Sequence, residues 1–184
     1  MLTKGTRSLV FAQFIAVALM GWNSQASPAQ SIDTYGLSEH VRKQLVTLPY
    51  YGVFDNLEYR IQGNTVILSG QVVRASTKSD AEGRIKRLAG VERVVNNIRV
   101  LPLSSIDAGL RRRVYRAVFG FGGLARYSMG VNPSIHIIVE NGRVTLEGVV
   151  DNKTDSDMAY LRANGVPGIF SVTNHLRVQN SRQR

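Results

Sequence analysis

Apolar and polar positions along the first half of the chain change their periodicity in a definite order. Apolar residues first recur at helical spacing, at Leu37, Val41, Leu45 and Leu48. Two stretches of alternating apolar and polar residues follow, over 57–61 and 66–72, with a turn at Gly63-Asn64 between them. A second helical pattern covers 76–88, and a short apolar stretch covers 94–100. This order predicts an α-β-β-α-β unit with a β-hairpin at its centre.

The same order returns in the second half of the chain. Residues 57–100 align with 135–178 without a gap, and identical residues coincide at Val66/Val144, Leu68/Leu146, Gly70/Gly148, Gly90/Gly168 and Asn96/Asn174. The first helix aligns at a different offset, so the second copy has gained five residues between Gly120 and Pro133, an insertion expected to form a loop. We predict an α+β fold of two tandem αββαβ two-layer sandwiches, each a three-stranded sheet covered by two helices. Copies of this size are marginal alone, so packing of one against the other is expected.

The N-terminal residues have the pattern of a cleavable secretory signal peptide. Lys4 and Arg7 precede an apolar run over 9–22, which is shorter than the roughly 20 residues of a membrane-spanning helix. We place cleavage after Ala26, with Ala29 as the second choice. The domains expected are therefore a signal peptide (1–26), a linker (27–35), the first copy (36–102), the second copy (104–179) and a basic C-terminal tail (180–184).

Composition narrows the range of partners. The formal net charge is +10, which favours anionic partners such as nucleic acid, acidic polymers or lipid headgroups, and export excludes nucleic acid. The absence of cysteine excludes a lipid-modified leader cysteine, disulfides and thiol catalysis. Gly120-x-x-Gly123 imitates the phosphate clamp of a KH domain, but a short glycine pattern is common by chance, and we interpret it as a loop.

The repeated motif resembles the BON domain, a family named for a bacterial osmotically inducible periplasmic protein and nodulation proteins. In the first copy it consists of Val66, Leu68, Gly70 and Val72, then Gly90, Val94, Asn96, Ile98 and Val100, and the second copy repeats it. The resemblance covers nearly the whole exported part. It implies an αββαβ fold, a periplasmic location and a non-enzymatic role, with association with phospholipid membranes as the proposed general activity.

The glycines and asparagines of the motif have structural explanations. Gly70 and Gly148 interrupt strands and indicate a bulge or a close backbone approach. Gly90 and Gly168 fit positions after a helix that need a positive φ, and Asn96 and Asn174 are expected to hydrogen-bond a neighbouring turn. His40, His136 and His175 lie in different elements without metal-ligand spacing, and acidic residues near 151–157 are expected at a helix N-terminus. We therefore predict no catalytic residues, no metal and no cofactor.

One helix face in the second copy carries the candidate contact residues. With Leu110, Val114, Ala117, Val118 and Phe121 facing the core, helical geometry groups an aromatic and cationic stripe on the opposite side: Arg112, Tyr115, Arg116 and Phe119. Such residues are suited to the headgroup region of an anionic membrane. The first copy has an ordinary solvated face there, Glu39, Arg42, Lys43 and Val46. In the alternative interpretation, Tyr115 and Phe119 pack between the copies and the arginines only keep the surface soluble.

Two functional hypotheses remain from the sequence. The first is a peripheral phospholipid-binding, stress-protective protein of the periplasm, whose partner is an anionic phospholipid membrane surface. The second is a protein-protein interaction or scaffold module of the cell envelope that binds another envelope protein and no lipid.

Overall fold

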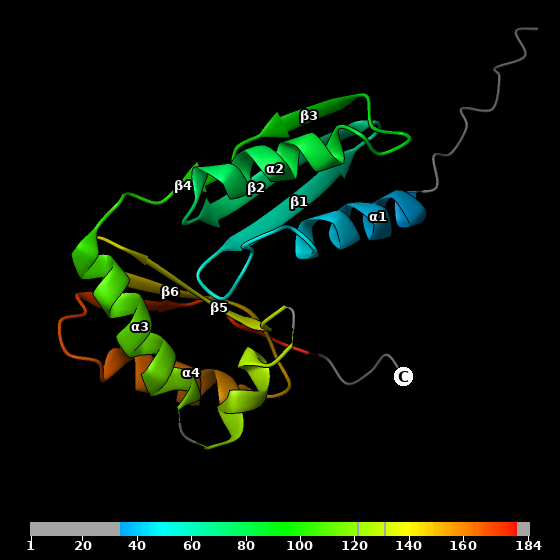
Figure 1. Cartoon of the computed structure of the whole chain (residues 1–184). Coiled ribbons are helices and arrows are strands. Elements are labelled where there is room, and N and C mark those ends of the chain that lie inside the picture. The colour runs from blue at the N-terminus through cyan, green and yellow to red at the C-terminus, as the bar shows by residue number, and fades with distance from the viewer. Residues whose placement is uncertain (1–33, 121, 131, 180–184) are drawn as a thin grey trace, which may run out of the picture. The chain divides into compact units, whose positions relative to one another are not determined.

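Each copy places two helices on one face of a sheet (Figure 1). The computed structural model describes residues 34–120, 122–130 and 132–179. The predicted signal peptide (1–26), the linker up to residue 33, Phe121 and the tail (180–184) lie outside the described residues. The fold is α+β, as predicted, with the αββαβ order present twice.

The elements of the first copy are listed here in chain order: α1 (Thr34–Val46), β1 (Asn56–Gln62), β2 (Thr65–Val72), α2 (Ala75–Ile85), β3 (Arg93–Asn96) and β4 (Arg99–Val100). Those of the second copy are α3 (Ser105–Phe119), η1 (Gly122–Ser128), β5 (Ile135–Glu140), β6 (Arg143–Val150), α4 (Lys153–Asn164), β7 (Ser171–Asn174) and β8 (Arg177–Val178). Apolar residues of both helices and of the central strand form one buried cluster in each copy.

The two sheets have the same register. In the first copy β1 pairs antiparallel with β2, and Leu57 lies opposite Gly70; in the second copy Ile135 of β5 lies opposite Gly148 of β6. The strand after the crossover helix pairs in parallel with the central strand in both copies, which places β2 and β6 at the centre of their sheets. The sequence alignment of the copies is therefore also a structural alignment.

The predicted third strand is interrupted in both copies, and an asparagine accounts for the interruption. The Oδ1 atom of Asn96 accepts the backbone N–H of Ile98 at 3.1 Å, and its Nδ2 donates to the carbonyl oxygen of Lys78 in α2 at 3.1 Å. Asn174 repeats this arrangement with Leu176 and Ser156, at 3.1 and 3.3 Å. This side chain takes the place of a strand hydrogen bond and ties the break to the crossover helix. The strand splits into β3 and β4, or β7 and β8.

Gly70 and Gly148 stand where the backbone of the preceding strand approaches too closely for a side chain. Gly70 has a φ of +108°, and a Cβ there would lie 2.1 Å from the carbonyl oxygen of Asn56. Gly148 has a φ of +122°, and its Cβ would lie 2.0 Å from the carbonyl oxygen of Ser134. Because only glycine adopts this backbone without strain and leaves this space, the position belongs to the fold.

The insertion of the second copy is not an open loop, so that expectation was wrong. It folds into the 3-10 helix η1, whose Leu124 and Tyr127 are buried in the core of the second copy. A short segment gains this structure because two of its side chains find apolar partners, a gain that its local sequence does not reveal.

Replacing Gly148 with alanine should destabilise the protein strongly. The positive φ and the overlap with the Ser134 carbonyl together predict a loss of about 3 kcal/mol or more in the free energy of unfolding. Gly90→Ala is the matched control, because Gly90 also has a positive φ, +87°, but no atom lies within 4 Å of its Cβ position. That variant should lose only about 1 kcal/mol. Urea unfolding followed by circular dichroism measures both, and equal losses would contradict the role of the close approach.

Candidate functional site

Helix α3 is fixed to the second sheet by polar as well as apolar contacts. Ser104 caps the helix, its Oγ accepting the N–H of Asp107 at 3.1 Å. The buried carboxylate of Asp107 accepts the N–H groups of Asn141 and Gly142, both at 2.9 Å, at the turn between β5 and β6. Arg111, also buried, donates to the carbonyl oxygen of Val139 at 2.8 Å. The orientation of α3, and hence of its outward residues, is therefore set by the sheet.

The predicted stripe on α3 is only partly exposed. Arg112 and Arg116 are exposed, and Tyr115 is 36% exposed. Phe119 is 5% exposed, so the expectation that it faces outward was wrong. Its ring lies 5.0 Å from that of Tyr115, which in turn lies 6.2 Å from the ring of Phe54 in the first copy. The face that remains accessible consists of Arg112, Tyr115 and Arg116.

The loop between α1 and β1 brings the first copy against this region. The carbonyl oxygen of Val53 accepts the N–H of Ile137 at 2.7 Å, on the outer edge of β5. Val53 and Phe54 also pack against the apolar cluster of the second copy. An edge strand presents unpaired backbone groups, and this loop satisfies one of them. The contact places Phe54 beside Tyr115.

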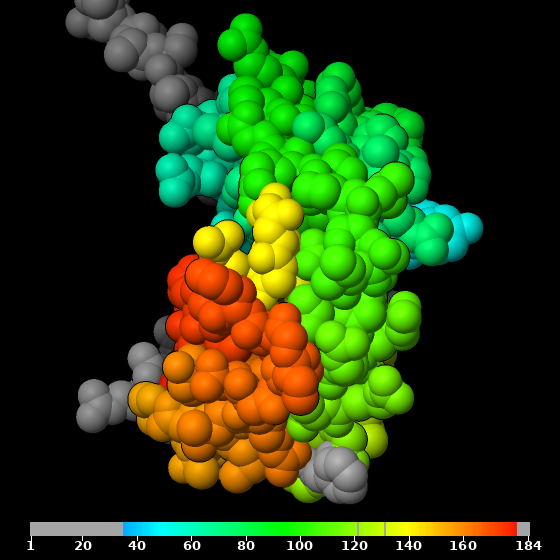
Figure 2. Space-filling view, turned by 90° about the vertical axis from the view of Figure 1, so that its left-hand side faces the viewer, coloured from blue at the N-terminus to red at the C-terminus, as the bar shows by residue number. Residues whose placement is uncertain are grey.

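Two shallow hollows lie on either side of Arg116. The first is lined by Val53, Phe54, Arg112, Tyr115 and Arg116. The second lies between α3 and the end of α4 and is lined by Arg113, Arg116, Ala117, Leu161, Arg162, Gly165, Val166 and Pro167. Figure 2 shows a face on which α3 (green) and the end of α4 (orange) lie side by side. We call the residues of both hollows the basic face; four of them are arginines, and none is acidic.

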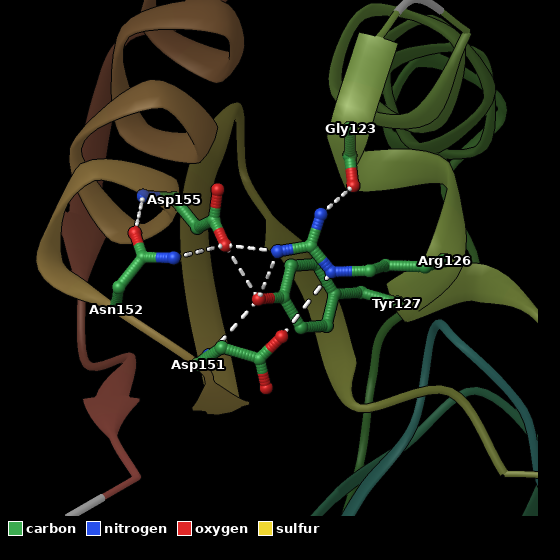
Figure 3. Close-up of polar contacts among 6 residues, drawn as sticks. All are labelled: Gly123, Arg126, Tyr127, Asp151, Asn152 and Asp155. Atoms are coloured by element: carbon green, nitrogen blue, oxygen red, sulfur yellow. Dashed lines mark hydrogen bonds and ion pairs between the residues drawn. The ribbon is translucent and has the colours of Figure 1, made fainter. Parts of the chain in front are cut away.

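The acidic residues at the start of α4 are engaged by the insertion (Figure 3). Arg126 of η1 forms ion pairs with Asp151, at 3.2 Å, and with Asp155. The hydroxyl of Tyr127 donates to the carboxylate of Asp155 at 2.6 Å and accepts the N–H of Asp151 at 2.9 Å. Burial raises the pKa of Tyr127. The cluster joins η1 to the helix N-terminus, a pairing of residues that the sequence did not indicate.

The histidines lie in separate surroundings. His40 is exposed on α1, and His175 lies with its Nδ1 2.7 Å from a carboxylate oxygen of Glu147. His136 is buried between the copies, its Nδ1 3.2 Å from the carbonyl oxygen of Gly52, and burial lowers its pKa. Over the described ranges, no three residues of the His, Asp and Glu types gather closely enough to hold a metal ion. The same ranges contain no helix with the length and apolar character needed to cross a membrane.

One of the comparisons with known proteins identifies a family. The family model of the BON domain matches residues 37–102 and 126–180, so it covers both copies, although its second match begins after α3. No curated protein matches the sequence significantly. Among solved structures, the chain is similar to CdsD, a structural protein of the type III secretion system of Chlamydia trachomatis, at 13% identity over 78% of this chain and 92% of that chain, with a TM-score of 0.27. It is also similar to the C-terminal domain of CdsD, at 14% identity over 81% of this chain and 100% of that chain, with a TM-score of 0.29.

Phe119→Ala should act on stability. Because Phe119 is buried in the core cluster of the second copy, removing its ring should lower the free energy of unfolding by about 3 to 5 kcal/mol. Tyr115→Ala, one helical turn away and partly exposed, should cost much less. Chemical denaturation of the two variants distinguishes them; similar small losses would mean that Phe119 does not pack in the core.

The lowered pKa of His136 predicts that acid weakens the folded state. A histidine that stays neutral when buried makes its full contribution to the free energy of unfolding above its pKa in the unfolded chain, about 6.5. This contribution is lost as the pH falls below that value. The difference in unfolding free energy between wild type and His136→Gln should therefore shift against wild type between about pH 7 and pH 5. Burial raises the pKa of nearby Asp55, which has the opposite effect, but Asp55 is present in both proteins. A difference that does not change with pH would refute the assignment.

Proposed function

This chain belongs to the BON domain family, and from that premise we propose that it binds the surface of anionic phospholipid membranes through the basic face. BON domains are generally non-enzymatic modules associated with the cell envelope. The predicted signal peptide exports the protein to the periplasm, where it binds the membrane peripherally. The protein protects the envelope by binding to the membrane surface, and it catalyses no reaction there.

The observation that carries the proposal is a pair of exposed arginines, Arg112 and Arg116, that have no acidic partner among the described residues. Neither Arg112 nor Arg116 makes an ion pair with any carboxylate in the part of the chain that the structure describes. At the equivalent place in the first copy, Arg42 pairs with Glu39 at 2.6 Å. A solvated face of the usual kind balances its charges, whereas the face on α3 leaves them available to phosphate groups.

The aromatic residues beside these arginines suit the same surface. Tyr115 has an amphipathic ring and is partly exposed, and Phe54 of the first copy lines the same hollow. Aromatic rings at headgroup depth supply apolar contact, while arginines supply attraction to anionic lipid. The contact between the copies therefore supports the proposed face, because it brings a second aromatic ring beside α3.

Vesicle sedimentation tests the proposal. The protein should sediment with vesicles that contain phosphatidylglycerol, and not with pure phosphatidylcholine, and raising the salt concentration should release it because screening weakens surface attraction. Arg112→Gln should reduce partitioning about fivefold, since each basic residue at an anionic surface contributes about 1 kcal/mol. The single substitution Tyr115→Ser should reduce partitioning by more than Arg112→Gln does.

Lys43→Gln supplies the matched control. It removes the same charge from the exposed face of α1 in the first copy and should leave partitioning nearly unchanged. Equal effects of Arg112→Gln and Lys43→Gln would show that net charge alone drives binding. A different result would be that the protein binds no vesicles, that wild type binds another envelope protein, and that Arg112→Gln abolishes this binding. The basic face would then serve a scaffold function.

A further inference from the structure

We call the hollow between α3 and the end of α4 the arginine hollow. Electrostatic attraction to an anionic membrane needs only exposed cations, but this hollow also has an apolar lining. Three arginines from two helices surround it, Arg113 and Arg116 from α3 and Arg162 from α4. The remaining lining is apolar or glycine: Ala117, Leu161, Gly165, Val166 and Pro167. Cationic groups thus border a hollow that is otherwise apolar.

Backbone carbonyl groups orient two of the three guanidinium groups. Arg113 donates to the carbonyl oxygen of Pro167 at 3.5 Å, and Arg162 donates to that of Val118, in the last turn of α3, at 3.4 Å. Arginine carries five N–H donors in a planar fork, so Arg113 keeps donors after its one weak bond. The side chain of Arg116 makes no hydrogen bond or ion pair within the part of the chain that the structure describes. The arrangement is held in place and has capacity to bind.

The charge balance of the arginine hollow favours an anion. The C-terminal ends of α3 and α4 contribute partial negative charge, each equivalent to about half an elementary charge. Three guanidinium groups exceed that compensation, and no lining residue is acidic. Cations held near one another repel, so a bound anion relieves this repulsion as well as accepting hydrogen bonds.

The apolar lining distinguishes an amphiphile from a simple anion. Leu161 is 66% exposed at the side of the hollow, and Pro167, which is also exposed, lines the same hollow. Inorganic phosphate would leave this surface in water, whereas a molecule with a hydrocarbon part beside its phosphate would cover it. The lining therefore matches a phosphate group with hydrocarbon attached.

The first copy shows which of these residues the fold needs. Arg84 occupies the place of Arg162 and makes the same kind of bond, to the carbonyl oxygen of Thr47 at 3.1 Å. Where the second copy has Leu161, the first has Gly83, and where it has Arg113 and Arg116, the first has His40 and Lys43. Only the anchoring arginine is common to both copies. The first copy forms the αββαβ fold without the other residues, so the fold does not require them.

We propose that the arginine hollow binds the phosphate of a single phospholipid molecule, with Arg113, Arg116 and Arg162 contacting the phosphate and Leu161 contacting the adjoining hydrocarbon. This deepens the proposed function, on which it rests for the source of the lipid. It differs from surface attraction because the site is saturable, takes one molecule, and uses α4 as well as α3.

A soluble short-chain lipid tests the site without a membrane. Dihexanoyl phosphatidylglycerol, kept below its micelle-forming concentration, is titrated into the exported protein, without the predicted signal peptide, and followed by calorimetry and by amide NMR shifts. We expect saturable binding of one molecule with shifts in α3 and α4, and binding of inorganic phosphate at least tenfold weaker. Phosphate that binds as tightly as the lipid would overturn the assignment of a phospholipid ligand.

Matched variants assign the binding to this hollow. Arg116→Gln and Leu161→Gln, both at exposed positions, should each weaken lipid affinity at least fivefold, and Lys43→Gln in the first copy should leave it unchanged. Unaltered affinity in Arg116→Gln and Leu161→Gln, or an absence of saturable binding, overturns the proposal. Vesicle binding without binding of the monomeric lipid would overturn this site alone and leave the proposed function standing. Binding of the monomeric lipid without vesicle binding would overturn the proposed function and leave this site standing.

Discussion

The central strand of each copy is hydrogen-bonded along both edges, and this pairing constrains the rest of the unit. β2 runs antiparallel to β1 and parallel to β3 and β4, and β6 has the same neighbours in the second copy. Because buried backbone groups must be paired, the strand after the crossover helix has to follow the central strand even where it breaks. In both copies an asparagine side chain hydrogen-bonds the backbone where the strand breaks. In both copies a glycine also leaves room for the closely approaching backbone at the start of the hairpin.

With the scaffold duplicated, the copies differ mainly in what covers it. The second copy buries Leu124 and Tyr127 of η1 in its core, and the loop of the first copy covers the edge of β5 through Val53. These additions leave one side of α3 and the end of α4 uncovered, and that side carries the arginines. The surface that we propose binds an anionic ligand thus lies on a unit whose own folding requires little of it, since the first copy keeps only the anchoring arginine.

Much of the fold followed from periodicity. Alternation predicted the hairpins, helical spacing predicted the four helices, and the repeated motif predicted that the copies share a register. The split of the third strand did not follow, because the apolar pattern continues across it while Asn96 and Asn174 exchange strand bonds for side-chain bonds. The helix η1 did not follow either, since its stability depends on partners distant in sequence, among them Asp155.

For the candidate site, the sequence by itself determined that α3 of the second copy has a cationic and aromatic side that the first copy lacks. Only the tertiary structure decided which of those residues stay accessible: Phe119 is buried, while Arg112 and Arg116 are exposed. It also decided that Arg162 joins Arg116 at one hollow. The physical reason is that helical geometry orders residues around one helix, whereas burial and proximity depend on the segments that pack against that helix, and those come from elsewhere in the chain.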